Sequence, residues 1–204
     1  PIDDYGGGLP KDGKPIRTEY FIKGTEPTSI SSIYQKLRLS KSDNNKLANI
    51  VEIATGSYNE KDFILFKEND PTGGKDGKNL WQEGIDSWIN GQSDPIFHSP
   101  KDTSSTNENS VVVRVKSPSD MTQIDSNNLT VSADARAVKD INKMELYIDD
   151  SLKTTVNNNS LEENLNLDTG IHRIKVKAYN TSNDSGESTV IVGIKTSPNP
   201  TATS

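Results

Sequence analysis

The fold is decided by residues 110–196, which read SVVVRVKSPSDMTQIDSNNLTVSADARAVKDINKMELYIDDSLKTTVNNNSLEENLNLDTGIHRIKVKAYNTSNDSGESTVIVGIKT. Apolar residues alternate with polar ones in seven short runs, and Asn, Asp, Ser and Gly separate the runs. Successive side chains of a strand point to opposite faces, so this period of two indicates strands with one buried face and one solvated face. Seven such strands predict a β-sandwich. The runs lie at 111–115, 129–135, 144–148, 152–156, 161–167, 174–178 and 190–194.

Composition limits what the rest of the chain can be. Only 30% of the 204 residues are hydrophobic, and they form regularly patterned runs in the second half but only a few islands in the first, so we expect one compact domain and a more loosely structured partner region. The net charge is −6 without a basic stripe, which disfavours nucleic acid as a partner. The chain has no cysteine, which excludes disulfides, thiolate metal sites and thiol catalysis.

Residues 1–98 are predicted to be a largely irregular segment, because Gly and Pro interrupt its apolar stretches. Short strands are expected in its β-prone runs, which lie at 18–22, 32–39 and 61–66. The stretch 44–51 is polar and then weakly apolar, and no element is assigned to it. The predicted fold class is therefore mainly β, with a sandwich of about seven strands after an irregular segment.

One short α-helix is predicted over about 79–90. Its apolar residues recur at a period of 3.6 and share one face, which carries Trp81, Ile85, Trp88 and Ile89. Asn79 can cap its start and Gly91 can end it. A helix this short is marginal alone, so its two-Trp face is expected to pack on a neighbouring domain of the same protein. A binding partner and a membrane surface are alternatives, although the acidic polar face disfavours the membrane. Trp81 and Trp88 are therefore candidate contact residues.

The segments flanking the sandwich carry linker composition. Residues 99–109 contain no hydrophobic residue and predict a flexible linker, and 197–204 predict a disordered tail, which leaves 110–196 for the sandwich. No apolar stretch reaches the roughly 18 residues of a membrane span. The chain begins with Pro1 rather than Met, so we expect it to belong to a longer or processed protein with any targeting signal upstream.

No catalytic, cofactor or metal site is predicted. His98 and His172 are far apart in the sequence, which does not provide a clustered metal site, and no G-x-S-x-G string occurs. The carboxylate pairs Asp149/Asp150 and Glu162/Glu163 are interpreted as solvated charges, because a glycosidase pair needs an enclosing cleft. A surface calcium ion in the Asn/Asp-rich loops stays open, although no EF-hand spacing is present.

Tyr147 is the candidate ligand contact of the sandwich. It lies on the strand face opposite Met144, Leu146 and Ile148, so it points away from the predicted core. An aromatic ring on that face can stack on a sugar. Packing within the sheet is the alternative interpretation.

Residues 18–28, TEYFIKGTEPT, resemble the E-x-F-I-x-G-T-E-P-T tail of class A penicillin-binding proteins, the bifunctional peptidoglycan synthases. The strings at 62–68, 81–86 and 96–100 are similar to the segment after that tail in some members, so the resemblance covers about 6–100. Residues 110–194 separately resemble the bacterial Ig-like modules that are appended to such enzymes, which implies that the sandwich is Ig-like. This second resemblance is carried by the strings at 115–118, 129–133, 141–149 and 170–178. Asp150 departs from it, because these modules usually place Gly in that hairpin.

The resemblance implies the non-catalytic C-terminal part of a bacterial peptidoglycan synthase in the extracytoplasmic cell envelope. The three transpeptidase motifs of the family have no counterpart in this chain, so no catalytic residue is carried over. The parent enzyme would be a glycosyltransferase/transpeptidase with an upstream membrane anchor. The implied role is to position it at peptidoglycan or a cell-wall protein, with its transpeptidase domain as a further partner. The alternative is an Ig-like interaction module of a secreted adhesin or carbohydrate-active protein.

Overall fold

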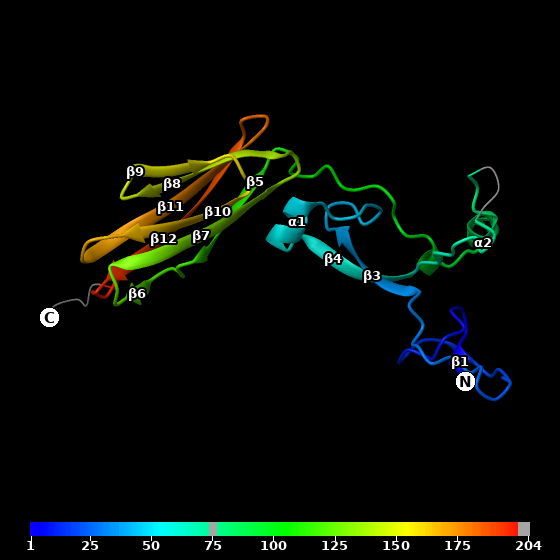
Figure 1. Cartoon of the computed structure of the whole chain (residues 1–204). Coiled ribbons are helices and arrows are strands. Elements are labelled where there is room, and N and C mark those ends of the chain that lie inside the picture. Colours follow the sequence, from blue (N-terminus) through cyan, green and yellow to red (C-terminus); the bar gives the residue numbers. More distant parts are fainter. Residues whose placement is uncertain (74–76, 200–204) are drawn as a thin grey trace. The chain divides into compact units, whose positions relative to one another are not determined.

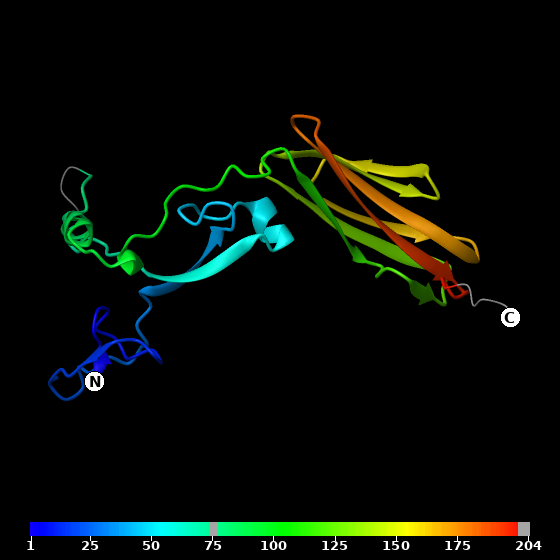
Figure 2. The ribbon, with the colours of Figure 1, turned by 180° about the vertical axis from the view of Figure 1, so that it is seen from behind.

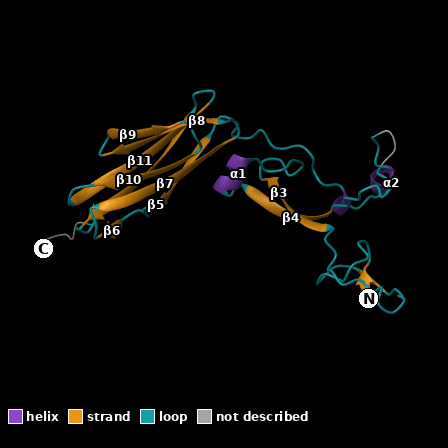
Figure 3. Cartoon of the chain, in the orientation of Figure 1, coloured by secondary structure: helices purple, strands orange, loops and turns teal. Residues whose placement is uncertain are grey.

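The structure is a computed structural model that describes residues 1–73 and 77–199 (Figure 1). Strands are its main secondary structure (Figure 3). The chain divides into two compact units. The first unit comprises Pro1–Leu39, Asn44–Leu47 and Asn59–Asp102, and the second comprises Ser40–Asp43, Ala48–Tyr58 and Thr103–Ser204. The last five residues of the predicted C-terminal tail lie outside the described residues.

The second unit is built on a sandwich of two sheets (Figure 2). One sheet has the strand order β10-β7-β5, and the other has the order β6-β12-β11-β8-β9. All seven expected runs are strands, and the predicted mainly-β class is confirmed. Strand β6 was not predicted, because a strand of three residues is too short to show an alternating pattern. The strands are β5 (Val111–Ser117), β6 (Thr122–Ile124), β7 (Asn128–Ala137), β8 (Ile141–Ile148), β9 (Ser151–Val156), β10 (Ser160–Asn166), β11 (Gly170–Asn180) and β12 (Ser185–Ile194).

The core of the sandwich consists of the alternate residues that the sequence pattern placed on one face. These side chains are almost completely buried, because successive residues of a strand point to opposite faces and the two inner faces pack together. The pairing is antiparallel throughout except for β6, which runs parallel to β12. Central core residues are Val131, Ala133, Ala135, Met144, Leu146, Ile148, Ile174, Val176, Ala178, Val192 and Ile194.

A two-residue turn joins β8 to β9. Asp149 and Asp150 both have positive φ, 49° and 64°, as a type I′ hairpin turn requires. Neither residue is glycine, so this conformation costs free energy. Hydrogen bonds offset part of the cost, because the Asp149 carboxylate accepts from the Arg173 N–H at 2.8 Å and from His172 Nδ1 at 2.7 Å. The departure from Gly at position 150 is therefore compatible with a tight turn.

Helix α1 (Ile50–Thr55) was not predicted, and it belongs to the sandwich unit, where it packs on β5 and β7. It is only six residues long, so no apolar stripe is visible in the sequence. Its start is fixed by a capping box in which Asn49 accepts from the N–H groups of Val51 and Glu52, while Glu52 Oε2 accepts from the Asn49 N–H at 3.0 Å. Gly56, at a φ of 71°, ends it.

Two buried side chains, those of Glu52 in α1 and of its N-cap Asn49, form hydrogen bonds with segments that are distant in the sequence. The Asn49 Nδ2 donates to the carbonyl oxygens of Ser104 at 3.0 Å and Thr106 at 2.7 Å. Glu52, 1% exposed, accepts from Ser40 Oγ at 2.5 Å. Ser104 and Thr106 lie inside the predicted linker 99–109, and the structure gives this part of it fixed partners that its composition did not indicate.

The first unit has two small sheets, β1 (Ile2–Asp3) with β2 (Ile16–Arg17) and β3 (Tyr34–Ser40) with β4 (Tyr58–Ile64). Two of the three expected strands correspond to β3 and β4. The expected strand at 18–22 was wrong, because Tyr20 and Ile22 are 92% and 81% exposed and pair with no strand. A small core of Tyr34, Ile64 and Phe97 holds the unit together, with Ile33, Phe66, Ile89 and Ile96 packed around it.

Helix α2 (Leu80–Asn90) lies in the first unit, close to the expected 79–90, with Asn79 as its N-cap. A short 3₁₀ helix, η1 (Pro95–Phe97), follows it. None of the helices in the described ranges is long and apolar enough to cross a bilayer.

Candidate functional site

Trp81 and Trp88 line a groove of about 460 Å³ along one face of α2, which we name the α2 groove. Gly84 lies between the two rings along the helix, and a Cβ there would meet nothing within 4 Å, so the helix surface is recessed between them. The two indole side chains remain 56% and 45% exposed. The complete lining is Asp4, Tyr5, Phe66, Trp81, Gly84, Ile85 and Trp88.

Edge-to-face contacts orient most of these rings. Trp88 packs on Phe66 with ring centroids 6.0 Å apart, and on Phe97 with centroids 5.2 Å apart. The buried Phe97 in turn packs on Tyr5 at 5.3 Å. Such pairs each contribute about 0.5–1.5 kcal/mol beyond the burial of their area. The groove is therefore largely preformed.

Hydrogen bonds fasten the first turn of α2 to the chain that follows β4. Asn79 Nδ2 donates to the Glu68 carbonyl at 2.6 Å, and its Oδ1 accepts from the Gln82 N–H at 3.0 Å. The Gln82 side chain accepts from the Glu68 N–H at 3.0 Å and donates to the Phe66 carbonyl at 3.3 Å. Phe66 is thereby held beside the helix, which fixes one wall of the groove.

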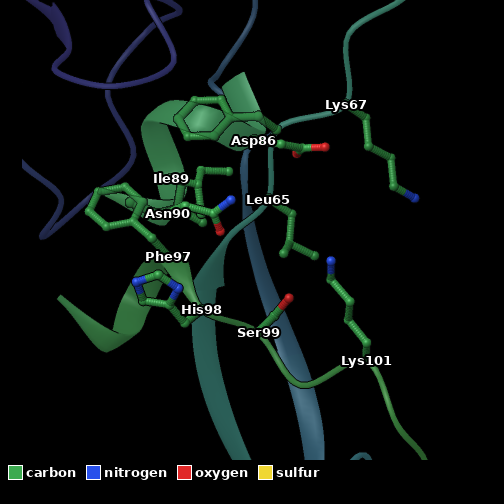
Figure 4. Close-up of a pocket in the computed structure, with 11 residues that line it drawn as sticks. Leu65, Lys67, Asp86, Ile89, Asn90, Phe97, His98, Ser99 and Lys101 are labelled. Atoms are coloured by element: carbon green, nitrogen blue, oxygen red, sulfur yellow. The ribbon is translucent and has the colours of Figure 1, made fainter. Parts of the chain in front are cut away.

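A second pocket of the first unit, of about 530 Å³, is lined by Asp86, Ile89 and Asn90 of α2, by residues 64–67, and by 97–99 with Lys101 (Figure 4). Two of its polar side chains are hydrogen-bonded to other residues of the first unit. His98 Nε2 is hydrogen-bonded to the Gln92 carbonyl at 2.7 Å, and Asp86 accepts from Gln82 Nε2 at 2.9 Å. Within the described part of the chain, no three His, Cys, Asp or Glu side chains are close enough to hold a metal ion.

Tyr147 lies on the outer face of the five-stranded sheet of the second unit. Its hydroxyl donates to Glu145 Oε2 at 2.7 Å, and this bond is the main reason why the pKa of Tyr147 is raised to about 12. Lys175 Nζ lies 5.1 Å from the ring centroid, a cation–π distance. Stacking of a sugar on that face would require Lys175 to move.

The structure brings Trp81 and Trp88 into one groove, and it places Tyr147 in the other unit. Sequence reasoning missed Asp4, Tyr5 and Phe66 as lining residues. Their only sequence signal is their residue type, because Tyr5 and Phe66 reach α2 through the fold of the first unit.

Two family models match the chain. Residues 112–176 match the bacterial Ig domain, so the second unit carries a bacterial Ig-like module. Residues 1–36 match the C-terminal domain of penicillin-binding protein 1A. Over the residues that they cover, the two matches confirm the resemblance predicted from the sequence, namely the C-terminal region of a class A penicillin-binding protein with an Ig-like module. Each match covers less than half of the chain.

Solved structures resemble parts of the chain. Fibronectin(III)-like modules of Clostridium thermocellum CbhA align over 42% of this chain and 46% of that chain, with 18% identity and a TM-score of 0.37. A superoxide reductase (neelaredoxin) from Ignicoccus hospitalis aligns over 40% and 78%, with 11% identity and a TM-score of 0.34. A Jonesia denitrificans lytic polysaccharide monooxygenase aligns over 38% and 58%, with 21% identity and a TM-score of 0.30. This chain thus spans less than half of the CbhA chain. No curated protein matches it significantly.

Proposed function

We propose that this chain is the non-catalytic C-terminal part of a bacterial peptidoglycan synthase and positions that enzyme at the cell wall. The observation that carries the proposal is the combination, in one chain, of the penicillin-binding protein 1A match at 1–36 with the Ig match at 112–176. A folded module attached to an enzyme raises the enzyme's effective concentration near whatever the module binds. The parent enzyme would be a membrane-anchored glycosyltransferase/transpeptidase working in the extracytoplasmic envelope.

A pelleting experiment tests the wall-binding role. The full chain is incubated with isolated peptidoglycan and centrifuged, with an unrelated β-sandwich protein as control. We expect the chain to pellet, and we expect Tyr147→Ala to pellet less than Tyr179→Ala, a matched change on the same sheet face. Pelleting no greater than the control would refute wall binding and leave docking to a cell-wall protein.

Absence of catalysis is tested separately with a fluorescent penicillin. The chain lacks the family's Ser-x-x-Lys and Lys-Thr-Gly strings, which carry the acylated serine and its partners. We expect no covalent label on this chain under conditions that label an intact penicillin-binding protein. A stable acyl adduct on any serine would contradict the proposal that this part is non-catalytic.

The segment matching penicillin-binding protein 1A also supports a contact with the transpeptidase domain expected upstream. It exposes several large apolar residues, of which Tyr20, Phe21 and Ile22 are consecutive, and contiguous exposed apolar surface commonly marks an interaction site. We expect Tyr20→Ser and Ile22→Ser to weaken binding of this chain to the separately produced transpeptidase domain. Ile171→Ser, a change at a 50% exposed sandwich residue, is the matched control. The exposed large apolar residues of this segment are Tyr5, Leu9, Ile16, Tyr20, Phe21, Ile22 and Ile30.

The parent reading frame decides between this function and the alternative, an Ig-like module of a secreted adhesin or carbohydrate-active protein. The transpeptidase strings Ser-x-x-Lys, Ser-x-Asn and Lys-Thr-Gly should precede residue 1 in that frame. A frame without them would favour the alternative.

A further inference from the structure

The α2 groove combines aromatic walls with a single carboxylate. Tyr5, Phe66, Trp81 and Trp88 supply four rings from three separate segments, and Asp4 supplies the charge. None of the seven lining residues is basic, and α2 itself carries Glu83 and Asp86 but no Lys or Arg. The faces of aromatic rings are electron-rich. The groove therefore favours a cation over an anion.

The Asp4 carboxylate is available to such a cation. Its side chain forms no ion pair with any residue in the described ranges. Arg17 is the basic residue that contacts Asp4, but its guanidinium donates to the Asp4 backbone carbonyl and lies 3.7 Å from Glu19. A purely apolar partner covering the groove would desolvate the Asp4 charge without pairing it, which is costly.

The groove also has the room and the rigidity that a small ligand needs. Its volume of about 460 Å³ is within the usual range for small-molecule sites. Gly84 leaves the space between the two indole rings open, and the edge-to-face contacts of Trp88 hold its ring in place. Clustered aromatic rings are the arrangement with which proteins bind quaternary ammonium groups, and the Asp4 carboxylate adds a charge of opposite sign.

We infer that the α2 groove binds a quaternary ammonium ligand of the choline type. The trimethylammonium group lies against the Trp81 and Trp88 rings over Gly84, and Asp4 pairs with its charge. This site is independent of the positioning role of the Ig-like module.

Intrinsic fluorescence reads this site directly, because Trp81 and Trp88 are the two tryptophans of the chain. The full chain is titrated with choline and with its neutral isostere 3,3-dimethylbutan-1-ol, and the Trp emission is followed. We expect saturable binding of choline, about tenfold tighter than that of the isostere, because only choline gains cation–π and ionic attraction. No saturable change, or equal affinities, would overturn the inference in favour of a merely apolar surface.

Matched variants locate the ligand. Asp4→Asn removes the ionic attraction and leaves the cation–π attraction, so choline is expected to bind only about threefold more tightly than the isostere, whereas Glu83→Gln, a change on α2 outside the groove, leaves the choline affinity within about twofold. Gly84→Leu fills the recess and should abolish binding while far-UV circular dichroism keeps the helix signal. Equal effects of Asp4→Asn and Glu83→Gln would overturn the proposed position.

The same chemistry can come from free choline or from a lipid headgroup. Co-sedimentation with phosphatidylcholine vesicles, compared with phosphatidylglycerol vesicles, distinguishes the two sources. Pelleting with phosphatidylcholine that Asp4→Asn removes assigns the headgroup. Saturable choline binding without pelleting assigns a soluble ligand. Pelleting with phosphatidylglycerol alone would overturn the inference, because an anionic headgroup would then be the ligand.

Discussion

Replacing Asn49 by Ala should release helix α1 and the segment around Thr106 together. Asn49 is 3% exposed, and its amide bonds in two directions. Its Oδ1 accepts from two N–H groups of α1, both at 3.0 Å, and its Nδ2 donates to the carbonyls of Ser104 and Thr106. Ala removes all four hydrogen bonds.

The structure sets the size of the effect. Loss of an N-cap costs about 1 kcal/mol. Each of the two carbonyls left without its donor adds about 1 kcal/mol, because both bonds are at least partly buried. The sum of about 3 kcal/mol corresponds to roughly a hundredfold larger population of the opened state.

Amide hydrogen exchange measures this opening segment by segment. We expect faster exchange in Asn49→Ala both at 50–57 and at 104–107. Asn79→Ala is the matched control, because Asn79 also caps a helix and also donates to a carbonyl, but in a more exposed place where water can replace the lost bonds. Its effect should be about tenfold or less and confined to the surroundings of α2. Equal effects of the two changes, or exchange at 104–107 unaffected by Asn49→Ala, would refute the reasoning.

Three further predictions concern the sandwich, with a change in α2 as the control for the first of them, and each is measured by chemical denaturation followed by circular dichroism. Gly186→Ala should destabilise it by about 2–3 kcal/mol, since a Cβ there would lie 1.9 Å from the Val111 carbonyl oxygen, whereas Gly84→Ala meets open space and should stabilise α2 by about 0.5–1 kcal/mol. Asp149→Gly and Asp150→Gly both relieve a positive φ. Asp150→Gly removes exposed ion pairs with Arg173 and Lys175, whereas Asp149→Gly removes the less exposed bonds to His172 and to the Arg173 N–H, so Asp149→Gly should lose more stability, by about 1 kcal/mol. The pKa of His172 is raised: burial acts to lower it, but the bonds to Asp149 and the Asp168 carbonyl outweigh burial. The wild-type chain should therefore have a higher free energy of unfolding than His172→Gln. This difference should be complete below the unfolded-state pKa of His172, about 6.5, and should be lost as the pH rises through the higher folded-state pKa. A difference in unfolding free energy that grows with pH would contradict the raised pKa.

The sandwich was predictable because its information is local. Period-two alternation in runs such as 129–135 and 174–178 places every second residue in the core, whatever the strand order is. The hairpin at 149–150 was less certain, because an Asp-Asp turn lacks the glycine of common type I′ turns. It depends on partners more than twenty residues away, His172 and Arg173, which bond to Asp149 once β11 lies beside β8.

Helix α1 and the α2 groove were not predictable, because both depend on contacts between residues far apart in the sequence. A six-residue helix shows no apolar stripe, and the residues that Asn49 fastens lie 55 and 57 positions away. The cap at Asn79 and the face of Trp81 and Trp88 were visible in the sequence, because they are local. Tyr5 and Asp4 reach the groove only through the tertiary fold of the first unit.

The tryptophan rings of the α2 groove and the tyrosine rings on the outer face of the sandwich differ in how their faces are used, and this difference bears on which of them binds a ligand. In the sandwich, Lys175 lies over Tyr147, and Lys143 and Lys177 both lie near Tyr179, at 4.6 and 5.0 Å from its centroid. These rings already interact with cations of the chain, so an external ligand must displace a lysine. Within the described ranges, no lysine or arginine lies over Trp81 or Trp88, and the nearby Asp4 has no ionic partner. A cation that binds this chain from outside therefore gains more in the α2 groove than on the sheet around Tyr147.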